Sequence, residues 1–276
     1  MQQLPRKHLV IPDTQVRPGV PTRHLHWIGR YIVEKQPDVV VHLGDHWDFP
    51  SLSSYSRRLD LEGARVKADI DAGNDALDEL TTPLIDYNEQ RKRLKEKLYR
   101  PRLVMLRGNH EERLNRAIAD NPQFQGLIGE FSFNDRRLGW EVHKFLEPVT
   151  IDGIVFAHYF YNPLTGRPWA GTAHTKLRNI GMTFTMGHVQ GIDSAHGITP
   201  DGRQRRALVV GSCYLHDEEY KGPQANHHWR GIIMKHEVRD GYYDLMEVSL
   251  DYLCRKYEGV PLAEWLAARP GLLRAA

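Results

Sequence analysis

Short apolar runs alternate with amphipathic stretches along the first part of the chain. Residues 8–12, 39–43 and 103–106 are largely apolar runs of the length and character of buried parallel strands. One helical face separates the first two runs and is formed by His24, Trp27, Ile28, Tyr31 and Ile32. The order strand, helix, strand predicts an α/β fold.

Residues 51–101 interrupt this alternation. Apolar or small residues recur there at steps of four and three, at Val66, Ile70, Gly73, Leu77, Leu80 and Leu84. This spacing predicts a helical insertion packed beside the sheet. We expect Pro83 to kink or break the helix and a second helical piece to cover 88–99. Its many Lys and Arg side chains favour a solvated face over a nucleic-acid site.

Short strands and turns fill the rest of the chain. The pattern predicts strands at 149–151, 154–157, 184–186, 194–198, 207–211, 231–237 and 242–248, and a closing helix at 262–268. The sequence contains no internal repeat, low-complexity tract or linker that would divide it. We therefore expect a single domain over 1–276, with the helical insertion at about 51–101.

Polar side chains follow five of the predicted strands. They are Asp13 and Gln15, Asp45 and Asp48, Asn109 and His110, His158, and His188 and Gln190. In α/β proteins the chemistry lies at the carboxyl ends of the strands, so these residues can meet at one edge. Carboxylate, carboxamide and imidazole groups are ligands for divalent first-row metals. The pattern indicates a metal centre, and Asp45 is the natural bridge between two cations.

The spacing of these residues resembles a known family. Asp13, Gly44-Asp45-x-x-Asp48, Gly108-Asn109-His110-Glu111, His158 and Gly187-His188 follow the order of the calcineurin-like metallophosphoesterase signature. The resemblance implies a four-layered αββα sandwich of mixed sheets. It also implies a dinuclear centre in which a metal-bound hydroxide attacks phosphorus in line.

The resemblance assigns ligands to two cations. One would be held by Asp45, Asn109, His158 and His188, and the other by Asp13, Asp45 and two further positions. Those two positions are His in most of the family and are Gln15 and Gln190 here. A carboxamide oxygen is a harder, weaker ligand, which predicts a labile site on the Asp13 side that prefers Mn²⁺ or Mg²⁺ over Zn²⁺. Alternatively, the two glutamines hydrogen-bond to each other or to water, and only one metal binds tightly.

Other residues near these motifs are candidates for proton transfer and substrate binding. The resemblance implies that His110 stabilises or protonates the leaving oxygen and that Asp48 orients the His110 ring. Arg107 and Arg113 could contact phosphate oxygens, although surface ion pairs are the more common use of such arginines. Trp47 could stack on a substrate ring or pack in the core.

The function expected from these residues is hydrolysis of a phosphoester. Basic residues around the insertion and the 107–111 turn favour a phosphodiester in a nucleotide or nucleic acid. One alternative is a phosphomonoesterase, including a protein phosphatase. Another is a non-catalytic metal-binding scaffold protein, which the retained Asp48 and His110 disfavour.

The composition and net charge exclude few classes of protein. The composition is that of an ordinary globular protein, with 41% hydrophobic and 26% charged residues and a net charge of +2. Two cysteines cannot form a disulfide framework, which suits a reducing compartment. No apolar run approaches the ~20 residues of a membrane span, and the N-terminus does not have the pattern of a signal peptide. A cytoplasmic protein with no membrane partner is expected.

Overall fold

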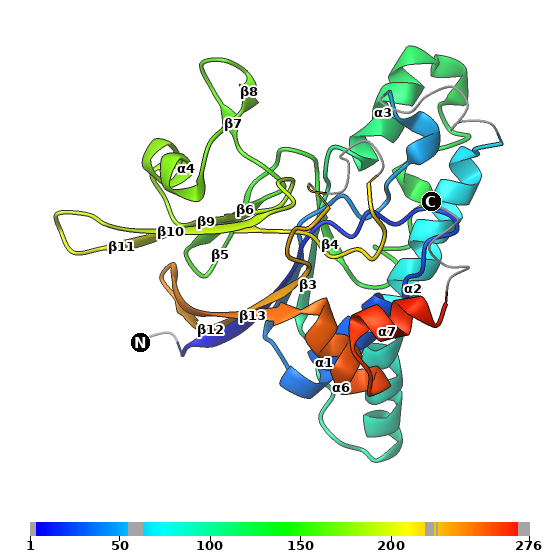
Figure 1. Ribbon diagram of the computed structural model, residues 1–276, viewed down its shortest axis with the longest axis horizontal. Helices are drawn as coiled ribbons and strands as arrows, with labels where there is room; N and C mark the ends of the chain where they lie inside the picture. The colour runs from blue at the N-terminus through cyan, green and yellow to red at the C-terminus, as the bar shows by residue number, and fades with distance from the viewer. Residues whose placement is uncertain (1–3, 55–62, 219–223, 225, 270–276) are drawn as a thin grey trace.

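The computed structural model describes residues 4–54, 63–218, 224 and 226–269. Its largest sheet has six strands, in the order β13-β12-β1-β2-β3-β4 (Figure 1). Their bounds are Tyr242–Ser249, Gly231–Arg239, Arg6–Ile11, Val39–His42, Arg102–Leu106 and Glu141–His143. Strands β1 to β4 run parallel, whereas β12 and β13 are antiparallel to their neighbours. The first sheet is therefore mixed.

The second sheet has five strands, in the order β10-β11-β9-β6-β5. Their bounds are Ile192–Ile198, Gln204–Val210, Phe184–Met186, Ile154–Ala157 and Val149–Ile151. The central strands β11, β9 and β6 are parallel, and the two outer strands are antiparallel to them. A small hairpin of β7 (Tyr161–Asn162) and β8 (Arg167–Pro168) follows β6 and projects from this side of the molecule (Figure 1).

Alternate side chains of the central strands face two different layers. On β1, Val10 belongs to a core shared with Phe156 and Leu208 of the second sheet. Its neighbours Leu9 and Ile11 belong to another core, which includes side chains of the helices. The first sheet is thus apolar on both faces, as a central parallel sheet should be.

The helices complete a four-layered arrangement. Helices α1 (Arg23–Lys35), α2 (Val66–Arg93), α6 (Leu250–Glu258) and α7 (Leu262–Ala267) contribute to the core on the outer face of the first sheet. Helix α4 (Ala173–Ile180) packs on the outer face of the second sheet, through Ala173 and Leu177 (Figure 1). The order helix, sheet, sheet, helix confirms the αββα prediction. The other helical segments named within the described residues are α3 (Glu111–Asp120), η1 (Pro50–Leu52), η3 (Pro122–Phe124) and η4 (Glu130–Ser132).

The structure corrects the prediction for the segment between β2 and β3. Helix α2 continues without a break through Pro83 and ends at Arg93, so no second helix covers 88–99. Pro83 removes one hydrogen bond but lies against α1 at Gly29, where an added Cβ would be 2.9 Å from the proline ring. Close packing on α1 keeps the helix continuous. Part of the predicted insertion, residues 55–62, lies outside the described residues.

The sequence pattern did not indicate β4, the β7–β8 hairpin or α6. Both cysteines, Cys213 and Cys254, are buried and free. Among the described residues no helix combines the length and the apolar character needed to cross a membrane.

Helix α1 carries a buried histidine that makes stability depend on pH. His24 Nε2 donates to the carbonyl of Cys213 at 2.9 Å, and burial lowers the pKa of His24 from 6.5 to about 3. Below pH 6.5 the unfolded chain therefore binds a proton at His24 that the folded chain does not bind. The free energy of unfolding is at its full value above pH 6.5 and falls as the pH is lowered below it. Between about pH 7.5 and about pH 5, the wild type should lose roughly 2 kcal/mol more unfolding free energy than His24→Gln.

Urea unfolding at the two pH values measures this difference. The control His196→Gln changes an exposed histidine on β10, which is solvated in both states, and should follow the wild type. Equal losses in the wild type and His24→Gln would contradict the prediction.

Candidate metal centre

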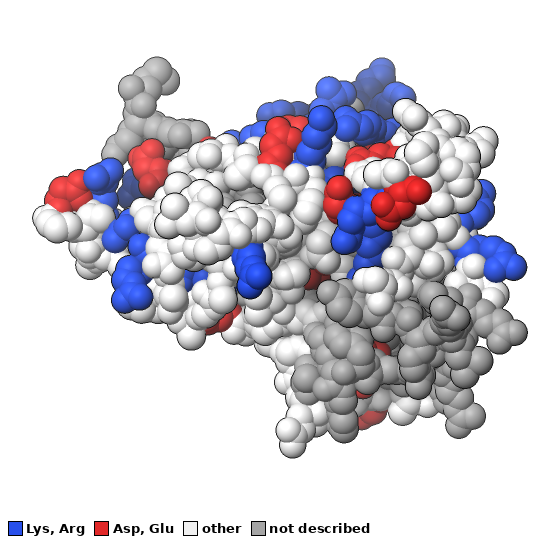
Figure 2. Space-filling view, turned by 90° about the horizontal axis from the view of Figure 1, so that it is seen from above, with Lys and Arg blue, Asp and Glu red and all other residues white. Residues whose placement is uncertain are grey.

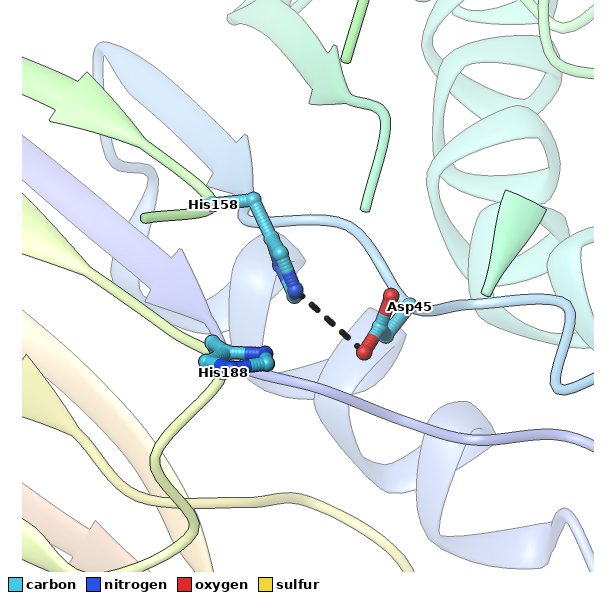
Figure 3. Close-up of side chains that lie close together, drawn as sticks. All are labelled: Asp45, His158 and His188. Atoms are coloured by element: carbon cyan, nitrogen blue, oxygen red, sulfur yellow. Dashed lines mark ion pairs between the residues drawn. The ribbon is translucent and has the colours of Figure 1, made fainter. Parts of the chain in front are cut away.

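Loops that follow strands of both sheets meet at one edge of the sandwich. Asp45 follows β2 of the first sheet, whereas His158 and His188 follow β6 and β9 of the second. One ligand atom from each of these three residues lies within 4.8 Å of the others (Figure 3). Asn109, after β3, joins them, since its Oδ1 is 2.9 Å from His158 Nε2. The structure thus brings together the four residues expected to hold one cation.

The ring of His158 is oriented by the loop beside it. Its Nδ1 donates to the carbonyl of Leu43 at 2.9 Å, which turns Nε2 toward Asp45 Oδ2 at 3.3 Å. Burial alone lowers the pKa of His158, but the charge of Asp45 outweighs it and raises the pKa to about 9. A position with this much negative charge attracts a cation, and an imidazole fixed through its other nitrogen is a common metal ligand.

A second group of oxygen atoms lies on the Asp13 side. Asp13 Oδ1 accepts the His188 N–H at 3.1 Å, while its Oδ2 is buried and has no hydrogen-bond partner. The Oε1 atoms of Gln15 and Gln190 are likewise buried and without partners. Buried polar atoms are rarely left unpaired in proteins. This oxygen-rich set fits a hard divalent cation.

The unpaired Oε1 atoms also bear on the alternative in which Gln15 and Gln190 form hydrogen bonds instead of binding a metal. A hydrogen bond between the Gln15 and Gln190 side chains would occupy one of their Oε1 atoms, and neither is occupied. In this structure the two glutamines therefore do not bond to each other, which leaves the other form of that alternative, in which they bond to water. Burial also raises the pKa of the Asp13 carboxyl to about 7, and the nearby charge of Asp45 acts in the same direction.

Three of the candidate ligands have an unusual backbone. Gln15, Asp45 and His188 have φ values of 39°, 49° and 66°, in the left-handed region that non-glycine residues rarely adopt. Such conformations cost about 1–3 kcal/mol each, and here three of them place candidate ligands at the site.

Two motif glycines allow the carboxylates to approach the neighbouring loops. A Cβ on Gly108 would lie 2.0 Å from Asp45 Oδ1, and a Cβ on Gly187 would lie 2.5 Å from Asp13 Oδ1. Any side chain at these positions would displace a candidate ligand.

Glu111 holds two of the loops together. Its carboxylate is buried and accepts backbone N–H groups from Asp45 at 3.0 Å, His46 at 2.6 Å and Gly108 at 2.7 Å. The Asp45 loop and the Asn109 loop therefore share one anchor at the start of α3. Glu111 belongs to the Gly-Asn-His-Glu motif, but the sequence did not indicate this anchoring role.

His110 and Asp48 form the expected pair. His110 Nδ1 lies 2.6 Å from Asp48 Oδ1, and its Nε2 lies 3.6 Å from Asp45 Oδ2. Burial lowers the pKa of His110, but the two carboxylates outweigh it and raise the pKa above its ordinary value. His110 is thus arranged to carry a proton beside the metal ligands.

The three candidate substrate-binding residues have different positions. Arg113 belongs to the site, because one of its terminal nitrogens is 3.1 Å from His110 Nε2. Trp47 is fully buried and stacks on Phe133 with ring centroids 4.1 Å apart. Arg107 is 2% exposed and pairs with Asp135 at 2.5 Å. Burial leaves Trp47 and Arg107 no surface for a substrate, which corrects that expectation.

A further arginine reaches the site without having been considered from the sequence. Arg17 Nε lies 2.9 Å from Asp48 Oδ2. Burial raises the pKa of Asp48, but Arg17 and His110 outweigh it and lower the pKa well below its usual range. The other end of the guanidinium contacts His216. Only the fold brings these residues together.

The comparison with protein families agrees with this geometry. A family model described as calcineurin-like phosphoesterase matches residues 7–258. The chain belongs to the calcineurin-like phosphoesterases. A search of curated proteins gave no match.

Membership in this family establishes the general activity. This calcineurin-like phosphoesterase is a metal-dependent phosphoester hydrolase, and the Asp45, His158 and His188 cluster is its candidate metal position. The family match therefore supports hydrolysis over the non-catalytic scaffold expected as one alternative.

Proposed function

We propose that this calcineurin-like phosphoesterase hydrolyses phosphodiesters, with a nucleotide or nucleic acid as the substrate. The observation that supports a diester is the charge beside His110. Arg113 donates to the carbonyl of Asp48 at 2.8 Å, and its nearest Asp48 carboxylate oxygen is 3.8 Å away. Its charge is therefore only weakly neutralised. One such guanidinium suits the single negative charge of a phosphodiester.

The surface charge supports a small substrate of this class. On the face shown in Figure 2, Lys and Arg side chains form several separate groups, with acidic side chains beside some of them. Such groups attract a polyanion but do not form one continuous track. Among phosphodiesters, this distribution favours a small one, such as a cyclic nucleotide or a dinucleotide, over a long nucleic acid.

The residues can be assigned to the parts of the reaction. Asp45, Asn109, His158 and His188 would hold one divalent cation. Asp13, Gln15 and Gln190 would hold a second one together with Asp45. When bound, these cations supply Lewis-acid activation of water and of the phosphate oxygens.

The other side chains handle the proton and the substrate. His110 would deliver the proton from Nε2 to the leaving oxygen, while Asp48 keeps Nδ1 protonated and orients the ring. Arg113 would bind a non-bridging phosphate oxygen beside Nε2.

Substrate preference tests the proposal. With Mn²⁺ added, bis-p-nitrophenyl phosphate should be hydrolysed with a higher kcat/KM than p-nitrophenyl phosphate. The reverse order would favour a phosphomonoesterase, including a protein phosphatase. No turnover of either ester by the metal-loaded protein would contradict both.

Metal preference is a separate prediction from Gln15 and Gln190. Activity should require added Mn²⁺ or Mg²⁺ and should be low with Zn²⁺ alone, because the Asp13 side offers oxygen rather than imidazole ligands. The double variant Gln15→His, Gln190→His should raise the activity measured with Zn²⁺ relative to that with Mn²⁺. The control Gln204→His, at an exposed position on β11, should leave this ratio unchanged. Equal turnover of the wild type with zinc as sole metal would contradict the prediction.

A further inference from the structure

Asp48 uses its two carboxylate oxygens for two different partners. Oδ1 lies 2.6 Å from His110 Nδ1, and Oδ2 lies 2.9 Å from Arg17 Nε. A carboxylate with one contact can rotate broadly about its Cβ–Cγ bond. The hydrogen bond to His110 and the ion pair with Arg17 pull on opposite oxygens and restrict this rotation, so Arg17 can influence the direction of the His110 ring through Asp48.

The guanidinium of Arg17 is also held from the other side. One terminal nitrogen donates to Glu218 Oε1 at 2.6 Å and to His216 Nε2 at 2.6 Å. The Glu218 backbone is itself fixed by Asn226, which accepts its N–H at 2.8 Å and donates to its carbonyl at 2.9 Å. Arg17 therefore connects His110 to a segment that follows β11.

The charges along this connection alternate in sign. Glu218 and Asp48 are acidic, with side chains only 7% and 6% exposed, and Arg17 lies between them. Opposite charges attract more strongly where water is largely excluded, and the Arg17–Glu218 contact is in addition a charge-assisted hydrogen bond. A planar guanidinium can serve both carboxylates at once, which a lysine ammonium on a flexible chain does less well.

We propose that Arg17 is a positioning residue that sets the orientation of His110 through Asp48, and that Glu218 holds Arg17 in place. The inference rests on the proposed proton transfer by His110. It adds to the site two residues, Arg17 and Glu218, that come from loops after β1 and β11.

The test is Arg17→Met in the Mn²⁺-loaded enzyme. We expect kcat to fall ~10- to 100-fold, with KM within about twofold of the wild type, because only proton delivery is misplaced. The loss should be larger for a methyl phenyl phosphate diester than for its p-nitrophenyl analogue, since the poorer leaving group depends more on the proton. In a His110→Ala background, Arg17→Met should cost no more than about twofold further.

Two variants and one measurement serve as controls. Arg23→Met removes an arginine that is 45% exposed and pairs with Glu258, and it should leave kcat unchanged. Glu218→Gln keeps the side-chain size and should give the same leaving-group pattern with a smaller loss, which also covers the case that Arg17→Met does not fold. Bound Mn²⁺ is measured in each variant because Arg17 is close in sequence to Gln15.

Several results would overturn the inference. They are an equal loss with both leaving groups, a loss of bound Mn²⁺ in Arg17→Met, and a full additional loss in the His110→Ala background. If Arg17→Met keeps full activity while His110→Ala is strongly impaired, the role of Arg17 is overturned and the proposed role of His110 stands. Unchanged activity in His110→Ala would overturn the proposed role of His110 as well.

Discussion

Replacing His110 with alanine is expected to lower kcat by ~10²–10⁴-fold, the usual contribution of general acid catalysis. Its Nδ1 is bound to Asp48 and its Nε2 faces the metal ligands, so Nε2 is the atom placed to give a proton to the leaving oxygen. The two carboxylates keep the pKa of His110 raised. Steady-state kinetics with Mn²⁺ and a diester measure the loss.

The control for this variant is His196→Ala, which changes an exposed histidine on β10 and should retain wild-type activity. Bound Mn²⁺ should be the same in both variants, because His110 is not an expected ligand. A kcat for His110→Ala close to that of the wild type would show that no proton passes through this residue.

Replacing Asp45 with asparagine should remove metal and activity together. Its Oδ2 lies 3.3 Å from His158 Nε2, and its Oδ1 accepts the His110 N–H at 2.9 Å. As the proposed shared ligand, it would contribute negative charge to both expected cations. Metal-ion catalysis provides several kcal/mol, so kcat/KM should fall roughly 10³-fold or more. Metal analysis of the purified variant should show less bound Mn²⁺ than in the wild type.

Asp71→Asn is the matched control, since it makes the same change in an exposed ion pair with Lys67 on α2. It should retain both metal and activity. An Asp45→Asn variant with full Mn²⁺ content and near-normal turnover would contradict the assignment of Asp45 as the bridge.

The apolar pattern predicted the layers of the fold because it reflects burial directly. Residues such as Val10 and Val41 face the second sheet, and their neighbours face the helices, so the buried parts of the central strands are largely apolar on both faces. The prediction that Pro83 breaks the helix was wrong, because close packing on α1 favours a continuous helix. Packing between distant elements of this kind leaves no periodic signal in the sequence.

The site was predictable to the extent that its residues immediately follow strands. Asp45, Asn109, His158 and His188 share that position, and the structure brings them together. The contact between Arg17 and Glu218 joins residues 201 positions apart, which no local pattern could indicate. Trp47 could not be placed either, because its burial depends on Phe133 from a separate segment.

The anchoring of two loops by Glu111 has a consequence for how the protein can vary. Since a single carboxylate at the start of α3 fixes both turns, the spacing of Asp45 and Asn109 does not depend on the length of chain between β2 and β3. The segment between β2 and β3 can lengthen or shorten during evolution while Asp45 and Asn109 keep their positions. New recognition surfaces can therefore arise there without any change to the chemistry.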